Sequence, residues 1–184
     1  MNATAAEILS NPHPSGHIVY PYTSEPQMFQ AVSLFIGAGL AASESALLFV
    51  EESHIEPLRR QLQENGFDVA ALELSGALAF VGVETLLTTF LFDGLIDEHK
   101  FKTAAGILIE QGKSASSTGR VRVFGEIVNL LWTRDPKSTQ RLEELWNDVI
   151  KLHSVPLLCA YSLGGTRPDA LPDSLISCHS QSVI

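Results

Sequence analysis

Short apolar runs that alternate with helical patterns are the feature that most constrains the fold of this chain. The runs are His17–Tyr20, Ala46–Val50, Leu78–Val83, Val121–Phe124 and Leu157–Tyr161. Continuous apolar runs of this length are typical of parallel strands that are covered on both faces. Strands that alternate with helices predict a parallel sheet with right-handed crossovers. We therefore predict an α/β fold in which helices cover both faces of a mostly parallel sheet.

The segments between these runs carry helix signals. Ser24, followed by Pro26 and Gln27, predicts a helix with Ser24 as its N-cap and Gln27 reaching back to it. Ser53 and Glu56 have the same capping spacing. Residues 135–136, Asp-Pro, predict the start of a later helix. Its inward face is predicted to be Leu142, Leu145, Trp146, Val149 and Ile150.

A chain of 184 residues fits one domain with a sizeable core, and no internal repeat or linker divides it. Residues 1–16 are rich in turn signals, so we predict a flexible N-terminal lead-in followed by a single domain over residues 17–184. A loop is expected over residues 164–172, which contain paired glycines and prolines.

The charge and the cysteine content limit the possible partners and compartment. The formal net charge of −9 argues against a nucleic-acid surface. No apolar run reaches the roughly 18 residues that cross a bilayer, and Met1–Gly16 lacks the pattern of a signal peptide. Cys159 and Cys178 are expected to be reduced thiols, so we expect a cytoplasmic protein without a membrane partner.

Polar residues follow the predicted strands where each strand ends. Gly125 and Glu126 follow the run that ends at Phe124, and Arg122 lies within that run. In open α/β sheets ligands bind beyond the carboxyl ends of the strands, so we expect a small-ligand pocket there. The other members of this pocket are expected to be Tyr22, Thr23, Glu51, Glu52, Gly82, Glu84, Tyr161 and Ser162. Two plainer interpretations stay open, namely an acid that favours a helix N-terminus and ordinary solvated loop residues.

The common catalytic motifs are absent from the sequence. The first strand–helix connection, Tyr20–Gln27, has no glycine and no lysine, so it cannot form a P-loop. There is no G-x-S-x-G, H-E-x-x-H or C-x-x-C pattern. We therefore expect no cofactor and no metal, and we favour a non-catalytic domain. A meeting of His17, Glu126 and His179 around a metal ion is the alternative that stays open.

Several phrases of the sequence resemble the MEDS domain, the methanogen/methylotroph sensory domain of the dichloromethane-responsive regulator. They begin with His17, Phe35–Leu40 and Arg122–Glu126, and continue in order with Leu142–Asn147, Leu158–Tyr161 and Cys178–Ser180. The resemblance covers residues 17–184. It implies a RecA/KaiC-like fold without the phosphate loop, and a sensory module that binds small organic or hydrocarbon-like ligands, often ahead of a histidine kinase.

The resemblance and the strand-end pattern together give the candidate ligand-binding residues. They are His17, Tyr22, Glu52, Arg122, Glu126, Glu143, Asn147, Tyr161 and His179. We predict a non-catalytic sensory domain that binds a small organic ligand and signals to a partner protein or to a fused output module such as a histidine kinase.

Two other functions stay open. One is a degenerate nucleotide-binding domain, with or without weak ATPase activity, in which acids such as Glu51 and Glu126 place Mg²⁺. The other is a pure protein-interaction domain. Self-association through the helices that carry Trp132 and Trp146 is a further possibility.

Overall fold

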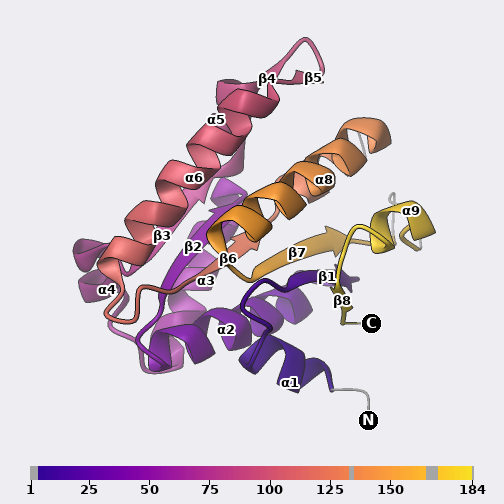
Figure 1. Ribbon diagram of the computed structural model, residues 1–184. Coiled ribbons are helices and arrows are strands. Elements are labelled where there is room, and N and C mark those ends of the chain that lie inside the picture. The colour runs from indigo at the N-terminus through magenta and orange to yellow at the C-terminus, as the bar shows by residue number, and fades with distance from the viewer. Residues whose placement is uncertain (1–3, 133–134, 165–169, 184) are drawn as a thin grey trace.

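The computed structural model describes residues 4–132, 135–164 and 170–183, and it shows a parallel sheet between two layers of helices (Figure 1). The strands of this sheet are β1 (His17–Tyr22), β2 (Ser45–Val50), β3 (Leu78–Gly82), β6 (Val121–Gly125), β7 (Leu157–Ser162) and β8 (Gln181–Ser182). β4 (Leu91–Phe92) and β5 (Leu95–Ile96) form a separate antiparallel hairpin.

The helices occupy both faces of the sheet. They are α1 (Ala5–Ser10), α2 (Glu25–Ala41), α3 (Glu52–Glu64), α4 (Val69–Ser75), α5 (Val83–Phe90), α6 (Glu98–Ala115), α7 (Ile127–Trp132), α8 (Pro136–His153) and α9 (Asp173–Ile176). In Figure 1 α2 and α3 lie below the sheet, and α6 and α8 lie above it. The predicted three-layer α/β fold is thus confirmed.

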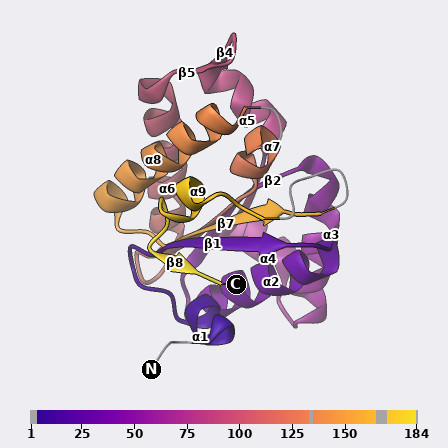
Figure 2. The same cartoon turned by 90° about the vertical axis from the view of Figure 1, so that its right-hand side faces the viewer.

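The strands run in the order β3-β2-β6-β7-β1-β8, and every pair is parallel. β6 therefore lies inside the sheet, between β2 and β7, as its short apolar run predicts, and all of its residues are buried. The short strand β8 follows β1 at the edge of the sheet (Figure 2). This order brings the carboxyl ends of β2, β6, β7 and β1 together, and it brings the C-terminal segment next to the start of β1.

Each face of the sheet carries its own apolar core. Successive strand residues point to opposite faces, so Val123 and Phe124 belong to different cores. The core beneath α5, α6 and α8 contains Phe101 and Trp146, whose rings meet edge to face with centroids 4.9 Å apart. The inward residues predicted for α8 are all buried, as expected.

Three local details differ from the sequence predictions. β1 continues through Pro21 to Tyr22, because β8 pairs only with Ile18 and Val19 and leaves the proline without a ladder partner on that side. The capping interactions predicted for Ser24 and for Ser53 do not form: Ser24 is the N-cap of α2 without a side-chain bond, and α3 begins earlier, with Glu51 as its N-cap.

Three further helices, α1, α4 and α9, were not predicted. The lead-in contains α1, which is closed by a capping box between Thr4 and Glu7 and buries Leu9. α4 follows α3 and begins at the N-cap Asp68. Residues 1–3 of the lead-in, and residues 165–169 of the predicted loop, lie outside the described ranges.

Candidate functional site

A polar cavity of about 500 Å³ lies at the carboxyl ends of the strands. Its lining comes from the β1–α2 connection, the start of α3, α7 and the end of β7. The lining residues are Tyr22, Thr23, Ser24, Glu25, Pro26, Glu51, Ser53, His54, Asn129 and Ser162. We call this feature the strand-end cavity. It lies where the topology of a parallel α/β sheet places ligands.

Glu126 lies next to this cavity and links the ends of two strands. Its Oε2 accepts a hydrogen bond of 3.0 Å from the Glu51 amide, and its own amide donates to the Phe49 carbonyl at 2.8 Å. His54 Nδ1 lies 2.9 Å from Glu126 Oε1, while His54 Nε2 lies 3.7 Å from Glu25 on the cavity wall. Glu126 is therefore a buried acid that orients the histidine of the wall.

Burial and pairing shift the titration of both groups. The hydrogen bond to Glu126 raises the pKa of His54, and the charges of Glu126, Glu51 and Glu25 raise it further against the opposing effect of burial. Burial raises the pKa of Glu126, and its bonds to His54 and Glu51 only partly offset that effect. Both shifts favour proton uptake by this pair, at the edge of a cavity whose wall carries Glu25 and Glu51.

Some of the candidate residues lie at the strand-end cavity and others do not. Tyr22 lines the strand-end cavity, and Glu126 lies directly next to it. Glu52 does not line it, because its carboxylate turns toward the end of β3, where a Cβ on Gly82 would clash with Glu52 Oε1. The neighbouring Glu51 lines the cavity instead.

Arg122 lies on the α2 face of the sheet and does not line the strand-end cavity. Its Nε donates to Glu44 at 2.6 Å, and its Nη1 lies within hydrogen-bond distance of the carbonyls of Leu9, Ser10 and Phe35. Arg122 is 4% exposed. Its contacts join β6, α1 and the end of α2, so they are those of a residue that holds the fold together.

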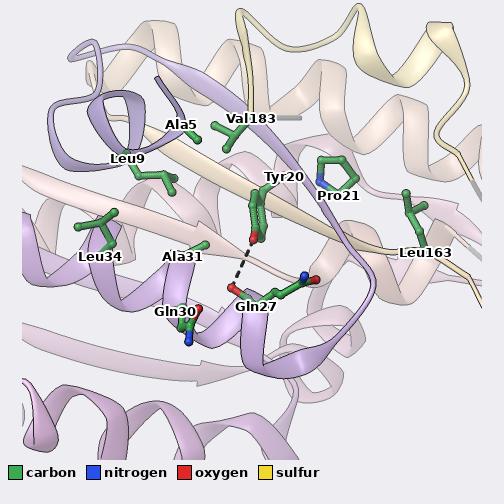
Figure 3. A pocket seen from close by; sticks show the side chains of 11 residues that line it. Ala5, Leu9, Tyr20, Pro21, Gln27, Gln30, Ala31, Leu34, Leu163 and Val183 are labelled. Carbon is green, nitrogen blue, oxygen red and sulfur yellow. Dashed lines mark hydrogen bonds between the residues drawn. The ribbon is translucent and has the colours of Figure 1, made fainter. Parts of the chain in front are cut away.

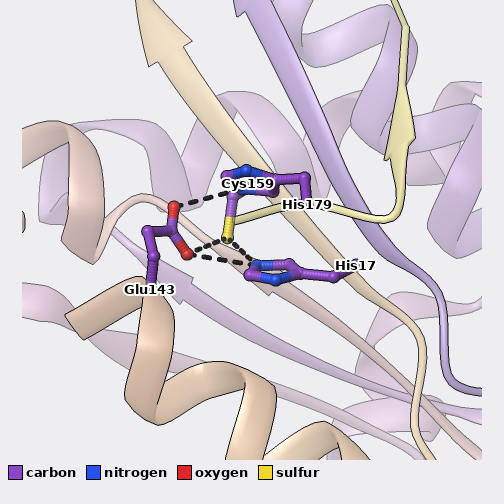
Figure 4. Close-up of side chains that lie close together, drawn as sticks. All are labelled: His17, Glu143, Cys159 and His179. Carbon is purple, nitrogen blue, oxygen red and sulfur yellow. Dashed lines mark hydrogen bonds and ion pairs between the residues drawn. The ribbon is translucent and has the colours of Figure 1, made fainter. Parts of the chain in front are cut away.

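Four side chains from separate segments meet on the α8 face of the sheet (Figure 4). They are His17 of β1, Glu143 of α8, Cys159 of β7 and His179, which follows α9; we call them the His–Glu–Cys–His cluster. Their ligating atoms all lie within 4.8 Å of one another. The prediction that His17 and His179 could meet is correct, but Glu126 is not with them, because it binds His54.

Two more candidate residues surround this cluster. The Tyr161 hydroxyl donates a hydrogen bond to Glu143 Oε1. Asn147 Oδ1 lies 2.9 Å from His17 Nδ1, and its amide nitrogen donates to the Cys178 carbonyl at 2.9 Å. Five of the residues that the resemblance indicated thus form one group beneath α8, separate from the lining of the strand-end cavity, whereas Arg122 and Glu126 lie outside it.

One carboxylate of this group has a strongly shifted pKa. Burial alone would raise the pKa of Glu143, but the nearby His17 and His179 outweigh that effect and hold this pKa well below its usual range. Burial, reinforced by the Glu143 charge, raises the pKa of the Cys159 thiol and of the Tyr161 phenol well above their usual values. The carboxylate is therefore ionised, and the phenol keeps its proton.

A second, apolar pocket of about 610 Å³ lies between α1, α2 and β1 (Figure 3). Its wall includes Leu9 of α1, Tyr20 and Pro21 of β1, and Leu34 of α2. The Tyr20 hydroxyl donates to the Gln27 carbonyl at 3.3 Å, so the polar end of the ring is satisfied. Val183 closes the pocket from the C-terminal side.

Sequence reasoning missed His54, Asn129 and the part played by Cys159. Asn129 Oδ1 accepts a hydrogen bond of 2.9 Å from the Ser162 amide, which joins α7 to the end of β7. A histidine two positions after the pair of acids that ends a strand was a usable signal for His54. Cys159 could be found only with the strand order, because the pairing of β1 with β7 places it near His17.

The chain matches a known family model and a known fold. The family is described as MEDS, the MEthanogen/methylotroph, DcmR Sensory domain, and the match covers residues 16–180. The structure is similar to that of a KaiC-like protein from the hyperthermophilic archaeon Pyrococcus horikoshii OT3, with a TM-score of 0.64 and 13% identity over 91% of this chain and 69% of that chain. At this identity the likeness concerns the fold alone. No curated protein matches the sequence. Within the described residues, no helix has the length and apolar character needed to span a membrane.

Proposed function

The chain belongs to the MEDS family of sensory domains, and on that premise we propose that it binds a small organic ligand in the strand-end cavity. The observation that carries the proposal is this cavity, whose wall holds Glu25, Glu51 and His54 beside the buried Glu126. The bound state is passed to a partner protein or to an output module such as a histidine kinase.

The charge of the cavity wall supports a particular class of ligand. Glu25 and Glu51 offer carboxylates, and Ser53 offers a hydroxyl group. Carboxylates favour ligands that donate hydrogen bonds or carry a positive charge. Small amines and alkylammonium ions have this chemistry, and their methyl groups can pack on Tyr22 and Pro26. We therefore propose a small organic cation as the ligand.

The same charges disfavour the nucleotide alternative. A triphosphate needs backbone amides and a cation around its phosphates. The β1–α2 connection supplies neither a glycine nor a lysine, and Glu25 lies in the first turn of α2, where a phosphate would meet it. Glu51 and Glu126 could approach Mg²⁺, but the hydrogen bonds from His54 and from the Glu51 amide already engage Glu126.

Two neighbouring acids provide a matched test of the proposed site. Glu51 lines the strand-end cavity, whereas Glu52 turns away from it toward Gly82. We expect methylammonium or trimethylammonium ions to raise the melting temperature of the wild type and of Glu52→Gln, and to have at least tenfold weaker affinity for Glu51→Gln. Calorimetric titration of each variant measures this difference.

The same titrations separate the alternatives. Equal affinities in both variants would contradict the cavity assignment. Saturable binding of ATP·Mg²⁺ to the wild type would favour the degenerate nucleotide-binding domain. Ala31→Trp should fill the apolar pocket of Figure 3. If this variant no longer binds the ligand, the binding site would be that pocket rather than the strand-end cavity. Native mass spectrometry of the purified chain would also reveal a ligand that it already carries, and its oligomeric state.

A further inference from the structure

The His–Glu–Cys–His cluster combines the side chains that bind transition metals, and it lies outside the strand-end cavity. Imidazole nitrogen, thiolate sulfur and carboxylate oxygen are the usual protein ligands of Zn²⁺. We propose that this cluster binds a divalent transition-metal ion of the Zn²⁺ type. The proposal reverses the expectation of ordinary histidines that the sequence suggested, and it does not depend on the ligand proposed above.

The spacing of the four ligating atoms suits a tetrahedral ion. With bonds of about 2.0 Å to nitrogen and oxygen and about 2.3 Å to sulfur, neighbouring ligands of a tetrahedral Zn²⁺ lie about 3.3 to 3.5 Å apart. His17 Nε2 lies 3.1 Å from Glu143 Oε2 and 3.4 Å from Cys159 Sγ. Cys159 Sγ lies 3.6 Å from the same Glu143 Oε2, so these three atoms have the spacing of tetrahedral ligands. His179 Nε2 lies 3.2 Å from the other carboxylate oxygen, Oε1, and the four ligating atoms all lie within 4.8 Å of one another, so a small adjustment of the side chains would complete the site.

The surrounding hydrogen bonds orient both imidazole rings for coordination. A carbonyl oxygen can only accept, so His179 Nδ1 donates to the Leu175 carbonyl at 2.9 Å. Asn147 uses its amide nitrogen on the Cys178 carbonyl, which turns its oxygen toward His17 Nδ1. Both Nδ1 atoms are therefore donors to groups outside the cluster, and both Nε2 atoms point into it. Metal-binding histidines commonly have this outer hydrogen bond.

One inward-pointing nitrogen lies at ion-pair distance from Glu143 but has no hydrogen-bond partner among the described residues. The His179 side chain is 0% exposed, and its Nε2 makes no hydrogen bond with any described residue. Its distance to Glu143 is short, but the geometry is not that of a hydrogen bond. Buried polar atoms are normally satisfied, so this nitrogen points to a binding partner of another kind.

The balance of charge also favours a cation at the centre. A neutral imidazole with a protonated Nδ1 has a lone pair on Nε2, so two lone pairs face a carboxylate and a sulfur atom. A Zn²⁺ ion with one carboxylate and one thiolate is formally neutral, and the thiol proton leaves to solvent when the metal binds.

A site with four protein ligands has no open position, so the ion would stabilise structure rather than catalyse a reaction. It would join three parts of the chain that are distant in sequence. The amide of His17 donates to Ser180 Oγ at 2.9 Å, and the Ser180 amide donates to the His17 carbonyl at 2.9 Å. Glu143 brings α8 to the same point. The metal would therefore fix the C-terminal segment against the sheet edge and α8.

The two cysteines give a matched experiment on the full chain. Cys159 belongs to the cluster, whereas Cys178 points to the Ser174 carbonyl and lies outside it. The chain is refolded with Co²⁺ alone or Zn²⁺ alone, and bound metal is quantified after gel filtration. We expect a single Co²⁺ per chain with a thiolate-to-cobalt absorption band, which Cys178→Ser keeps and Cys159→Ser loses.

Two further variants keep the test decisive. If Cys159→Ser does not fold, His179→Gln replaces it, because that residue lies on the C-terminal segment and should lose Co²⁺ while far-UV circular dichroism stays native. Asn147→Ala should bind Co²⁺ about 10- to 100-fold more weakly, as expected for a group that orients a ligand. A wild type that takes up neither ion, or a cobalt band that disappears in Cys178→Ser instead, would overturn the proposal.

Discussion

At the scale of single residues, Arg122 and Arg120 show how burial changes the role of a charge. Both approach Glu44, with Arg122 Nε at 2.6 Å and Arg120 Nε at 3.1 Å. The Arg122 side chain is 5% exposed and that of Arg120 is 52% exposed. Only the buried arginine also binds backbone carbonyls. The motif that contains Arg122 made it a candidate for ligand binding, but its contacts in the structure are those of a residue that stabilises the fold.

We expect Arg122→Met to lower the free energy of unfolding by about 3 to 5 kcal/mol, because it leaves Glu44 buried without its main partner. Arg120→Met should change that free energy by less than about 1 kcal/mol, as exposed ion pairs do. Urea denaturation of both variants measures the difference. Similar losses in the two variants would show that Arg122 does not have this structural role.

His54 should make the stability of the protein depend on pH. Its pKa is raised above its ordinary value of 6.5, chiefly by the hydrogen bond to Glu126. A group with a raised folded-state pKa contributes stability that is complete below its unfolded pKa and is lost as the pH rises through its folded pKa. As the pH rises from below to above 6.5, the wild type should therefore lose more unfolding free energy than His54→Gln does. Denaturation curves across this range provide the measurement, and parallel pH profiles would refute the role of His54.

At the scale of elements, the course of α2 depends on a glycine that faces Arg122. A Cβ on Gly39 would lie 2.6 Å from both Cδ and Nε of that arginine, whose hydrogen bonds hold it in place. Gly39 therefore allows α2 to pass close over β6. The Gly-Ala-Gly sequence at residues 37–39 lies near the end of a helix, whereas phosphate-binding glycines lie at a helix start. Its function here is close packing.

Gly39→Ala should destabilise the protein by about 1 to 3 kcal/mol through overpacking. The opposite sign would be expected from helix propensity alone, since alanine is favoured over glycine by about 1 kcal/mol in a helix interior. Thermal unfolding decides between the two signs. Combining Gly39→Ala with Arg122→Met should remove most of the additional loss, because the clash is with the arginine side chain.

The sequence was sufficient to predict the strands of the main sheet, apart from β8, and the inward face of α8, since continuous apolar runs and helical spacing are local signals. It did not predict α1, whose short length and single buried Leu9 give a weak pattern. It also could not group the site residues correctly. Arg122 and Val123 are neighbours in sequence, yet the pleat sends them to opposite faces, and the cluster partners of His17 are 126 or more positions away, because Glu143 is the first of them along the chain.

At the scale of the whole molecule, two apolar cores share one sheet, so they should unfold together. Trp132 and Trp146 both belong to the core on the α8 face, whereas Leu9 belongs to the core on the α2 face. Leu9→Ala should destabilise the protein by about 2 to 5 kcal/mol. Tryptophan fluorescence should report the same shift as far-UV circular dichroism, as in a two-state transition. A fluorescence transition that stays at the wild-type midpoint would show that the faces unfold separately.

Leu9 and Val183 both line the apolar pocket, so the first helix and the residue after the last strand, β8, lie close together in space (Figure 2). The order of the segments along the chain could therefore be changed without changing their arrangement in the fold. A circular permutant could join these two ends through a linker and begin instead at Gly94, in the turn between β4 and β5. Because that hairpin pairs only with itself, the permutant would keep every strand pairing of the six-stranded sheet.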